Sequence, residues 1–143
     1  MYQWIVALFH IATGYPLDQS GRLVSLVFFC TTLLPVYGLA RIWFDSRVCA
    51  LLLVCLVVLN PVYIFWSRTF LIETTVLFLS MCFLYFFTTS IHKRRIRDTV
   101  AAIAIAIAIA CLAGWVKTTT FAIFLVAAGF VLMPAIVQRA GVA

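Results

Sequence analysis

Residues 74–116 read TTVLFLSMCFLYFFTTSI-HKRRIRD-TVAAIAIAIAIACLAGWV, two uncharged apolar runs on either side of a short basic segment. A helix needs about twenty apolar residues to cross the hydrocarbon core of a bilayer. Each run is close to that length and holds no charged side chain. The stretch therefore predicts two membrane-spanning helices joined by a basic loop.

The rest of the chain repeats this pattern. Hydrophobic residues make up 66% of the 143 positions and charged residues 10%, and the mean hydropathy of +1.21 excludes an ordinary soluble domain. We predict an all-α, polytopic transmembrane helix bundle that forms a single transmembrane domain over residues 1–143. We expect spans near residues 23–42, 48–66, 70–91, 99–116 and 118–137, a polar turn at 18–22, and an interfacial or partial helix at 1–13.

Alanine alternates with isoleucine over residues 101–110. Strict alternation often indicates a half-buried strand. Both residue types are apolar here, and an open strand could not satisfy its backbone hydrogen bonds in lipid. The segment therefore predicts a helix whose small alanines allow close approach of its neighbours.

The basic residues predict the orientation of the spans. The net charge is +6, but the basic residues lie between apolar runs and form no nucleic-acid-binding face. If loops alternate across the membrane, seven Lys and Arg residues fall on one side and three on the other, with the segment 93–97 decisive. The positive-inside rule places that segment in the cytoplasm. The extracytoplasmic side then carries five charged residues: Asp18, Arg22, Arg68, Glu73 and Lys117.

The five cysteines lie within or beside spans, with no C-x-x-C pair and no histidine at ligand spacing. We interpret them as small apolar packing residues and expect no metal site. His10 and His92 have no partner in the sequence and are interpreted as structural.

Arg68 and Glu73 occur in the stretch WSRTFLIET, residues 66–74. Residues five apart on a helix diverge by about 140°, so the two side chains do not stack on each other. Arg68 could extend to the lipid headgroups. Glu73 is short and lies inside a span, where a carboxylate usually pairs or functions. Each side chain therefore needs a partner from another span or a ligand.

Lys117 interrupts an apolar run and could be an interfacial anchor. Together with Arg68 and a carboxylate it would also suit an anionic lipid headgroup. The Arg guanidinium can donate two hydrogen bonds to phosphate oxygens, and Lys adds a point charge. Asp18 and Arg22 share this face and complete the set of substrate-binding candidates, although a polar turn can leave both simply solvated.

Several short motifs follow one another along the chain: GRLVS at 21–25, NP at 60–61, SRTFLIE at 67–73, the basic loop at 92–98 and Lys117-Thr118. In this order they resemble the motifs of the membrane glycosyltransferases of the GT-C fold. The nearest types are the dolichyl-phosphate-mannose–protein mannosyltransferases and the bacterial transferases that move aminoarabinose and related sugars from undecaprenyl phosphate. The resemblance implies that Arg68 binds the lipid phosphate or positions the first external loop, that Glu73 belongs to the polar site, and that Lys117 lies near the phosphate.

The family carries its catalytic acid in the first external loop, after a first transmembrane helix. This chain opens inside what resembles the segment that follows that loop. We therefore expect a fragment that is truncated at both ends and inactive alone, with the main base upstream and Glu73 as a secondary catalytic candidate.

The resulting hypothesis is part of an integral-membrane glycosyltransferase. The enzyme would move a sugar from a polyprenyl-phosphate donor, its substrate rather than a cofactor, to a lipid, glycan or protein acceptor. We expect it in a bacterial inner membrane, among membrane lipids, with its site facing the periplasm and no nucleic acid as partner. The alternative is a non-enzymatic small transporter or membrane scaffold subunit, although no span carries a charge near its midpoint and no inverted repeat is visible.

Overall fold

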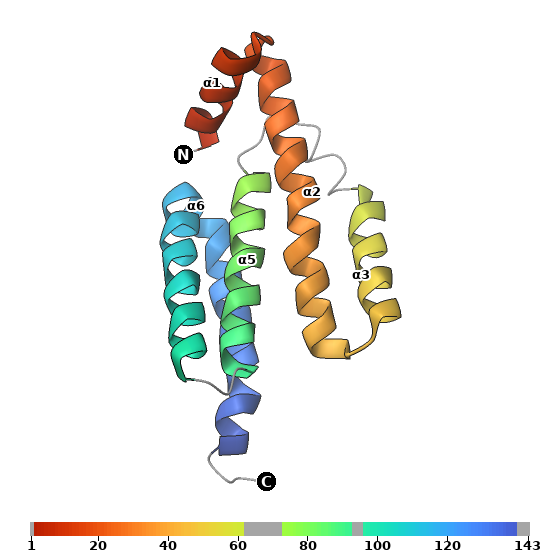
Figure 1. Cartoon of the computed structure of the whole chain (residues 1–143), viewed down its shortest axis with the longest axis vertical. Coiled ribbons are helices and arrows are strands. Elements are labelled where there is room, and N and C mark those ends of the chain that lie inside the picture. The colour runs from red at the N-terminus through yellow and green to blue at the C-terminus, as the bar shows by residue number, and fades with distance from the viewer. Residues whose placement is uncertain (1, 62–72, 93–95, 140–143) are drawn as a thin grey trace. The chain divides into compact units, whose positions relative to one another are not determined.

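A computed structural model describes residues 2–61, 73–92 and 96–139 of the chain (Figure 1). The described residues form helices and contain no strand, which confirms the all-α prediction. The helices are α1 (Tyr2–Thr13), α2 (Leu17–Phe44), α3 (Arg47–Leu59), α5 (Glu73–His92) and α6 (Ile96–Arg139). Three of them, α2, α5 and α6, are long and apolar enough to cross a membrane, and α3 is a shorter apolar helix.

The chain divides into two compact units, residues 1–78 and residues 79–143. In the first unit, α1 and α2 meet at a tight turn at the upper end of Figure 1. Gly14 adopts a positive φ of 70°, and its N–H donates to the carbonyl of His10 at 2.8 Å. The left-handed conformation of Gly14 ends α1. Glycine suits this position because a residue with a side chain would be strained in that conformation. Pro16 then precedes the first residue of α2.

The contact between α1 and α2 centres on Tyr2. Its ring packs with Val6 and Val24 in a buried cluster. The Tyr2 hydroxyl donates to the carbonyl of Gly21 at 3.1 Å and is hydrogen-bonded to the Ser25 hydroxyl at 2.8 Å. Burial raises the pKa of the Tyr2 phenol, while the hydrogen bond to Ser25 lowers it. The buried phenol thereby joins two helices through both its ring and its oxygen.

A second tight turn joins α2 to α3, and the two helices pack against each other as a hairpin (Figure 1). Asp45 takes a left-handed conformation with φ 46° at the end of α2. The Ser46 side chain then caps α3 by accepting from the N–H of Cys49 at 3.4 Å. The helix α3 ends before Asn60, which is extended because Pro61 follows it.

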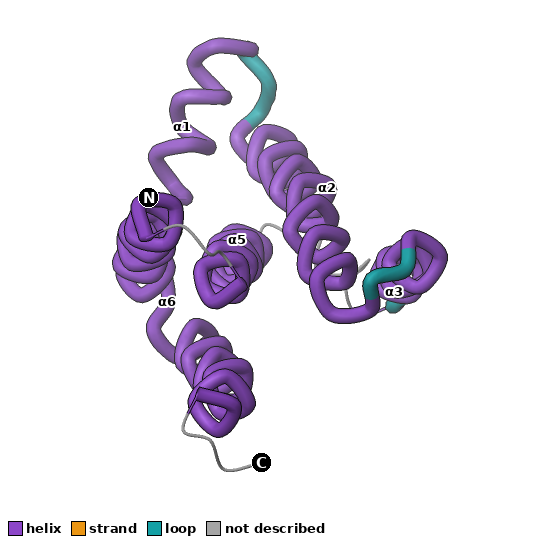
Figure 2. The backbone as a smooth tube through the Cα atoms, turned by 60° about the horizontal axis from the view of Figure 1, so that its bottom comes forward, coloured by secondary structure: helices purple, strands orange, loops and turns teal. Residues whose placement is uncertain are grey.

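The second unit contains residues 79–92 of α5 and all of α6. The helix α6 is interrupted at Lys117, whose backbone is extended with φ −162° and ψ 100°. Its first segment, residues 96–116, and its second segment, residues 118–139, run in opposite directions as separate coils (Figures 1 and 2). The Phe83 ring of α5 meets the Phe121 ring of the second segment edge-on, with centroids 5.3 Å apart. Aromatic contact thus joins α5 to the second segment of α6.

The described helices differ from the predicted elements in two places. The helix α2 begins at Leu17, so residues 18–22 are helical and the predicted polar turn is wrong. Asp18 favours this earlier start, because a carboxylate in the first turn interacts well with the helix dipole. The helix α3 stops inside the predicted span 48–66, and the residues beyond 61 lie outside the described part. The interruption at Lys117, in contrast, falls at the boundary expected between the spans 99–116 and 118–137.

Candidate functional site

Glu73 lies in the first turn of α5, half-buried, and is followed by the buried residues Thr74, Thr75 and Val76. A carboxylate in the first turn of a helix is stabilised by the positive end of the helix dipole. Its partial burial also limits access of water. The carboxylate is therefore held at a helix end, where a membrane protein can keep a charge close to the headgroup level.

Asp18 and Arg22 are brought together by the structure. They lie one turn apart on α2, and their side chains form an ion pair with an Oδ2–Nη2 distance of 3.0 Å. The Arg22 side chain is 60% exposed and the Asp18 side chain 63%, and an exposed pair of this kind stabilises a protein by at most about 1 kcal/mol. Because the pair is neutral as a whole, it attracts an anion less than Arg22 alone would.

Lys117 lies between the two segments of α6 and is half-buried. The next residue, Thr118, begins the second segment, and its hydroxyl donates to the Gly114 carbonyl at 3.0 Å. Trp115 is 89% exposed, which is typical of an indole ring at the membrane interface. The reversal of α6 thus places an ammonium group at the end of two membrane-spanning segments.

These positions give only part of the predicted site. Arg68 falls outside the described residues. Asp18, Arg22 and Glu73 belong to the first unit and Lys117 to the second. Convergence of these groups on one phosphate therefore stays a prediction.

The described residues hold no cluster of three or more His, Cys, Asp or Glu side chains that could bind a metal ion. All five cysteines are free thiols, and Cys82 is half-buried. The other four, Cys30, Cys49, Cys55 and Cys111, are exposed. The thiols of these four lie on helix surfaces, so their interpretation as small apolar packing residues stays a prediction.

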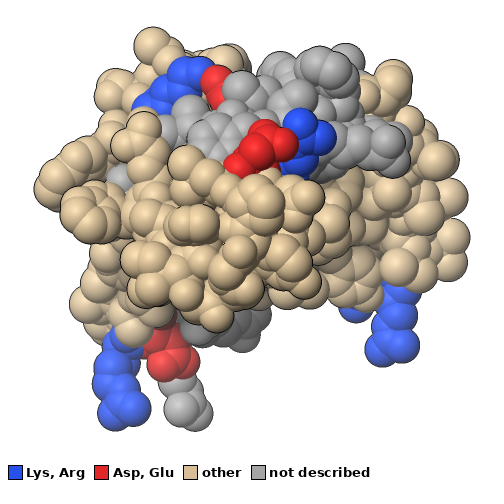
Figure 3. All heavy atoms as spheres, turned by 90° about the horizontal axis from the view of Figure 1, so that it is seen from above, with Lys and Arg blue, Asp and Glu red and all other residues tan. Residues whose placement is uncertain are grey.

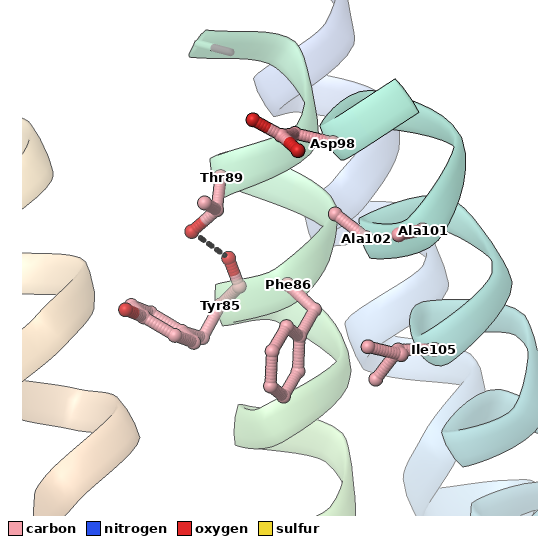
Figure 4. A pocket seen from close by; sticks show the side chains of 7 residues that line it. All are labelled: Tyr85, Phe86, Thr89, Asp98, Ala101, Ala102 and Ile105. Carbon is pink, nitrogen blue, oxygen red and sulfur yellow. Dashed lines mark hydrogen bonds between the residues drawn. The ribbon is translucent and has the colours of Figure 1, made fainter. Parts of the chain in front are cut away.

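A recess of about 300 Å³ lies between α5 and the first segment of α6 (Figure 4). It was not predicted from the sequence, where the only signal is one acid, Asp98, at the end of a basic segment. A carboxylate and a hydroxyl occupy one end, and apolar side chains form the rest. The recess is lined by Tyr85, Phe86, Thr89, Asp98, Ala101, Ala102 and Ile105.

The face drawn in Figure 3 consists mainly of uncharged side chains, with acidic and basic residues confined to small groups. The described charged residues lie at or near the ends of the long helices, as Asp18, Glu73 and Asp98 do in their first turns. Together with the three apolar helices, this distribution defines an integral membrane protein.

Comparison with protein families identifies the kind of membrane protein. The chain belongs to the Dolichyl-phosphate-mannose-protein mannosyltransferase family, whose model matches residues 1–140. This confirms the resemblance to the GT-C glycosyltransferases. Neither the comparison with curated proteins nor the comparison with solved structures found a match. The family makes this a membrane protein of the glycosyltransferase type, associated with a lipid-linked sugar donor.

Proposed function

We propose that this chain is part of a glycosyltransferase that uses a polyprenyl-phosphate sugar and acts on the extracytoplasmic side of a bacterial inner membrane. The observation that carries the proposal is the family match over residues 1–140. The excess of Lys and Arg in alternate loops supports the orientation. With the segment 93–97 in the cytoplasm, Glu73 and Lys117 belong to the outer ends of their helices.

The reaction requires one proton transfer and one displacement. A carboxylate takes the proton from an acceptor hydroxyl or amine, and the acceptor atom forms a bond to the anomeric carbon of the sugar. The bond between that carbon and the phosphate oxygen breaks, and polyprenyl phosphate leaves with the electron pair. Basic side chains stabilise the negative charge that grows on the phosphate.

The roles of the outer residues follow from their chemistry. Arg68 supplies a forked donor for two phosphate oxygens, and Lys117 adds a mobile positive charge. Glu73 contributes to the polar site as a secondary candidate for proton transfer. Asp18 and Arg22 neutralise each other at 3.0 Å and contribute mainly to the outer rim of the site.

A transfer assay tests the proposal. Membranes from cells that express the complete gene are incubated with a radiolabelled polyprenyl-phosphate sugar, and release of the sugar to lipid, glycan and protein acceptors is measured. Glu73→Gln should lower the rate by about tenfold to a hundredfold through loss of a charge-assisted contact. The matched control is Asp45→Asn, at an exposed position on the predicted cytoplasmic side whose left-handed backbone suits Asn. Absence of donor turnover with every acceptor class would refute the enzymatic role.

Arg68→Lys tests the phosphate contact. Lysine keeps the charge but loses the two-pronged geometry, so donor affinity or rate should fall by about tenfold to a hundredfold, or about 1.5–3 kcal/mol. An arginine that only extends to the headgroups would tolerate lysine, since both side chains have long stems. Near-normal activity of a well-expressed Arg68→Lys protein would rule out the phosphate role and leave Lys117 as the next residue to test.

A further inference from the structure

The recess between α5 and the first segment of α6 has two chemically different ends (Figure 4). Asp98 lies at one end, and its carboxylate points toward the side of α5 that carries Thr89. Phe86, Ala102 and Ile105 form the apolar part. The Tyr85 hydroxyl points away from the other labelled side chains, so this residue contributes its ring. An occupant of this recess must therefore combine a polar group with an apolar chain.

The polar end offers hydrogen-bond acceptors. The Thr89 hydroxyl donates its proton to the carbonyl of Tyr85 at 2.7 Å, which leaves lone pairs facing outward. An ionised carboxylate has only acceptor sites, so Asp98 adds no donor. Among the described side chains that line the recess, Asp98 and Thr89 offer no donor to a phosphate or carboxylate group, and Asp98 would repel either one. The matching group is a cation with several N–H donors.

A metal ion fits this end less well. Calcium takes six to eight oxygen ligands and magnesium requires octahedral coordination, whereas the recess offers one carboxylate and one hydroxyl. A primary ammonium group needs two or three acceptors, which is what Asp98 and Thr89 supply.

The position of the recess in the membrane indicates the source of the ammonium. The charge pattern puts the start of α6 on the cytoplasmic side. Ile105 follows Asp98 by seven residues, so at 1.5 Å per residue the recess reaches about 10 Å toward the bilayer centre. The hydrocarbon core of one leaflet is about 15 Å thick. The polar end therefore lies at the level of the inner headgroups, and the apolar end lies along the acyl chains.

We propose that this recess binds phosphatidylethanolamine from the inner leaflet. The ammonium group contacts Asp98 and Thr89, and one acyl chain covers Phe86 and Ile105. A volume of about 300 Å³ is at the lower end of the range for small-molecule sites, which suits a headgroup and the first part of a chain. This site is distinct from the outer residues of the proposed transfer reaction.

Lipid retention tests the proposal without any activity measurement. The purified protein is reconstituted in bilayers with equal amounts of phosphatidylethanolamine, phosphatidylcholine and phosphatidylglycerol, extracted in mild detergent, and its retained lipids are quantified. We expect phosphatidylethanolamine to exceed phosphatidylcholine by about tenfold, because the quaternary choline nitrogen has no N–H to donate. Equal retention of the two lipids by the native protein would overturn the proposal.

Asp98→Asn should remove this preference, and Asp45→Asn should keep it. Asp98 also stabilises the start of α6 through the helix dipole, but that role does not distinguish one lipid from another. If Asp98→Asn fails to fold, Ala101→Phe provides the test and should also remove the preference. Ala101 is exposed in the recess, so the phenylalanine ring would fill the recess while the Asp98 carboxylate stays. A folded variant of either kind that keeps the full preference for phosphatidylethanolamine would contradict the site.

Discussion

The helices α2 and α6 are both apolar, yet they bury different residues. In α2 the buried positions combine hydroxyl groups, such as Ser25 and Thr32, with large side chains, such as Phe29 and Leu39. Among the described side chains of α6, most buried positions are alanines, namely Ala102, Ala106, Ala113 and Ala128. Isoleucines of its first segment are exposed instead, with Ile107 58% exposed and Ile105 44%.

The difference shows how packing works for a chain in lipid. Burying isoleucine against protein gains little there, because lipid tails are as apolar as the side chain. Small residues let helix backbones approach and gain van der Waals contact instead. The Ala–Ile segment of α6 follows this rule, whereas the contact of α2 with α1 depends on hydrogen bonds and a few large side chains. The two regions should therefore respond differently to mutation.

The largest effect is expected where the alanine face is filled. Ala113→Phe forces a ring into a fully buried position and should destabilise the protein by about 3 kcal/mol, the upper part of the range for overpacking. Ile107→Phe, on the exposed face of the same segment, should have little effect. Unfolding in detergent measures both. Equal stability of the two variants would mean that the alanine face is not a packing surface.

A smaller effect is expected at the polar contact between α1 and α2. Tyr2→Phe keeps the ring but removes the hydrogen bonds to Gly21 and Ser25, and should cost about 1–2 kcal/mol. Hydrogen exchange of the α1 amides should increase correspondingly. Tyr15→Phe is the control, since Tyr15 is 50% exposed. Unchanged exchange in Tyr2→Phe would show that the apolar cluster alone holds α1.

The smallest effects are expected when a glycine is replaced by alanine in the turn before α2 and, separately, within α6. Gly14→Ala places a side chain at φ 70° and should destabilise the turn by about 1 kcal/mol. Gly129→Ala, inside α6 with open space around the new methyl group, should stabilise the helix by about 0.5–1 kcal/mol. Thermal unfolding should therefore shift in opposite directions. A shift of the same sign in both variants would contradict the assigned backbone conformations.

The helical class could be predicted from the sequence, because the length of an uncharged run limits what can cross a bilayer. The helical start of α2 at Leu17 could not, because Asp18 and Arg22 suit either a polar turn or an ion pair one helical turn apart. The exposure of Cys30 could not be predicted either, since hydropathy does not tell lipid-facing from protein-facing positions.

The candidate site was predicted as residue types on one side of the membrane. Glu73 and Lys117 could be selected because charges are rare in such a chain, but no pattern in the sequence gives their distance. The recess was missed because it depends on how Phe86 and Thr89 of α5 meet Asp98 and Ile105 of α6. Such contacts depend on the relative rotation of two helices, which uniformly apolar segments leave undefined.

The outward-facing site and the inner-leaflet recess both require the first turns of α2 and α6 to lie on opposite sides of the membrane. In a variant with all five native cysteines replaced, single cysteines are introduced as Gln19→Cys and Ile96→Cys, both at exposed positions. A membrane-impermeant maleimide should label Gln19→Cys in intact cells and Ile96→Cys only after permeabilisation. Labelling of Ile96→Cys but not Gln19→Cys in intact cells, or of both from one side, would contradict the outward-facing site and the inner-leaflet recess together.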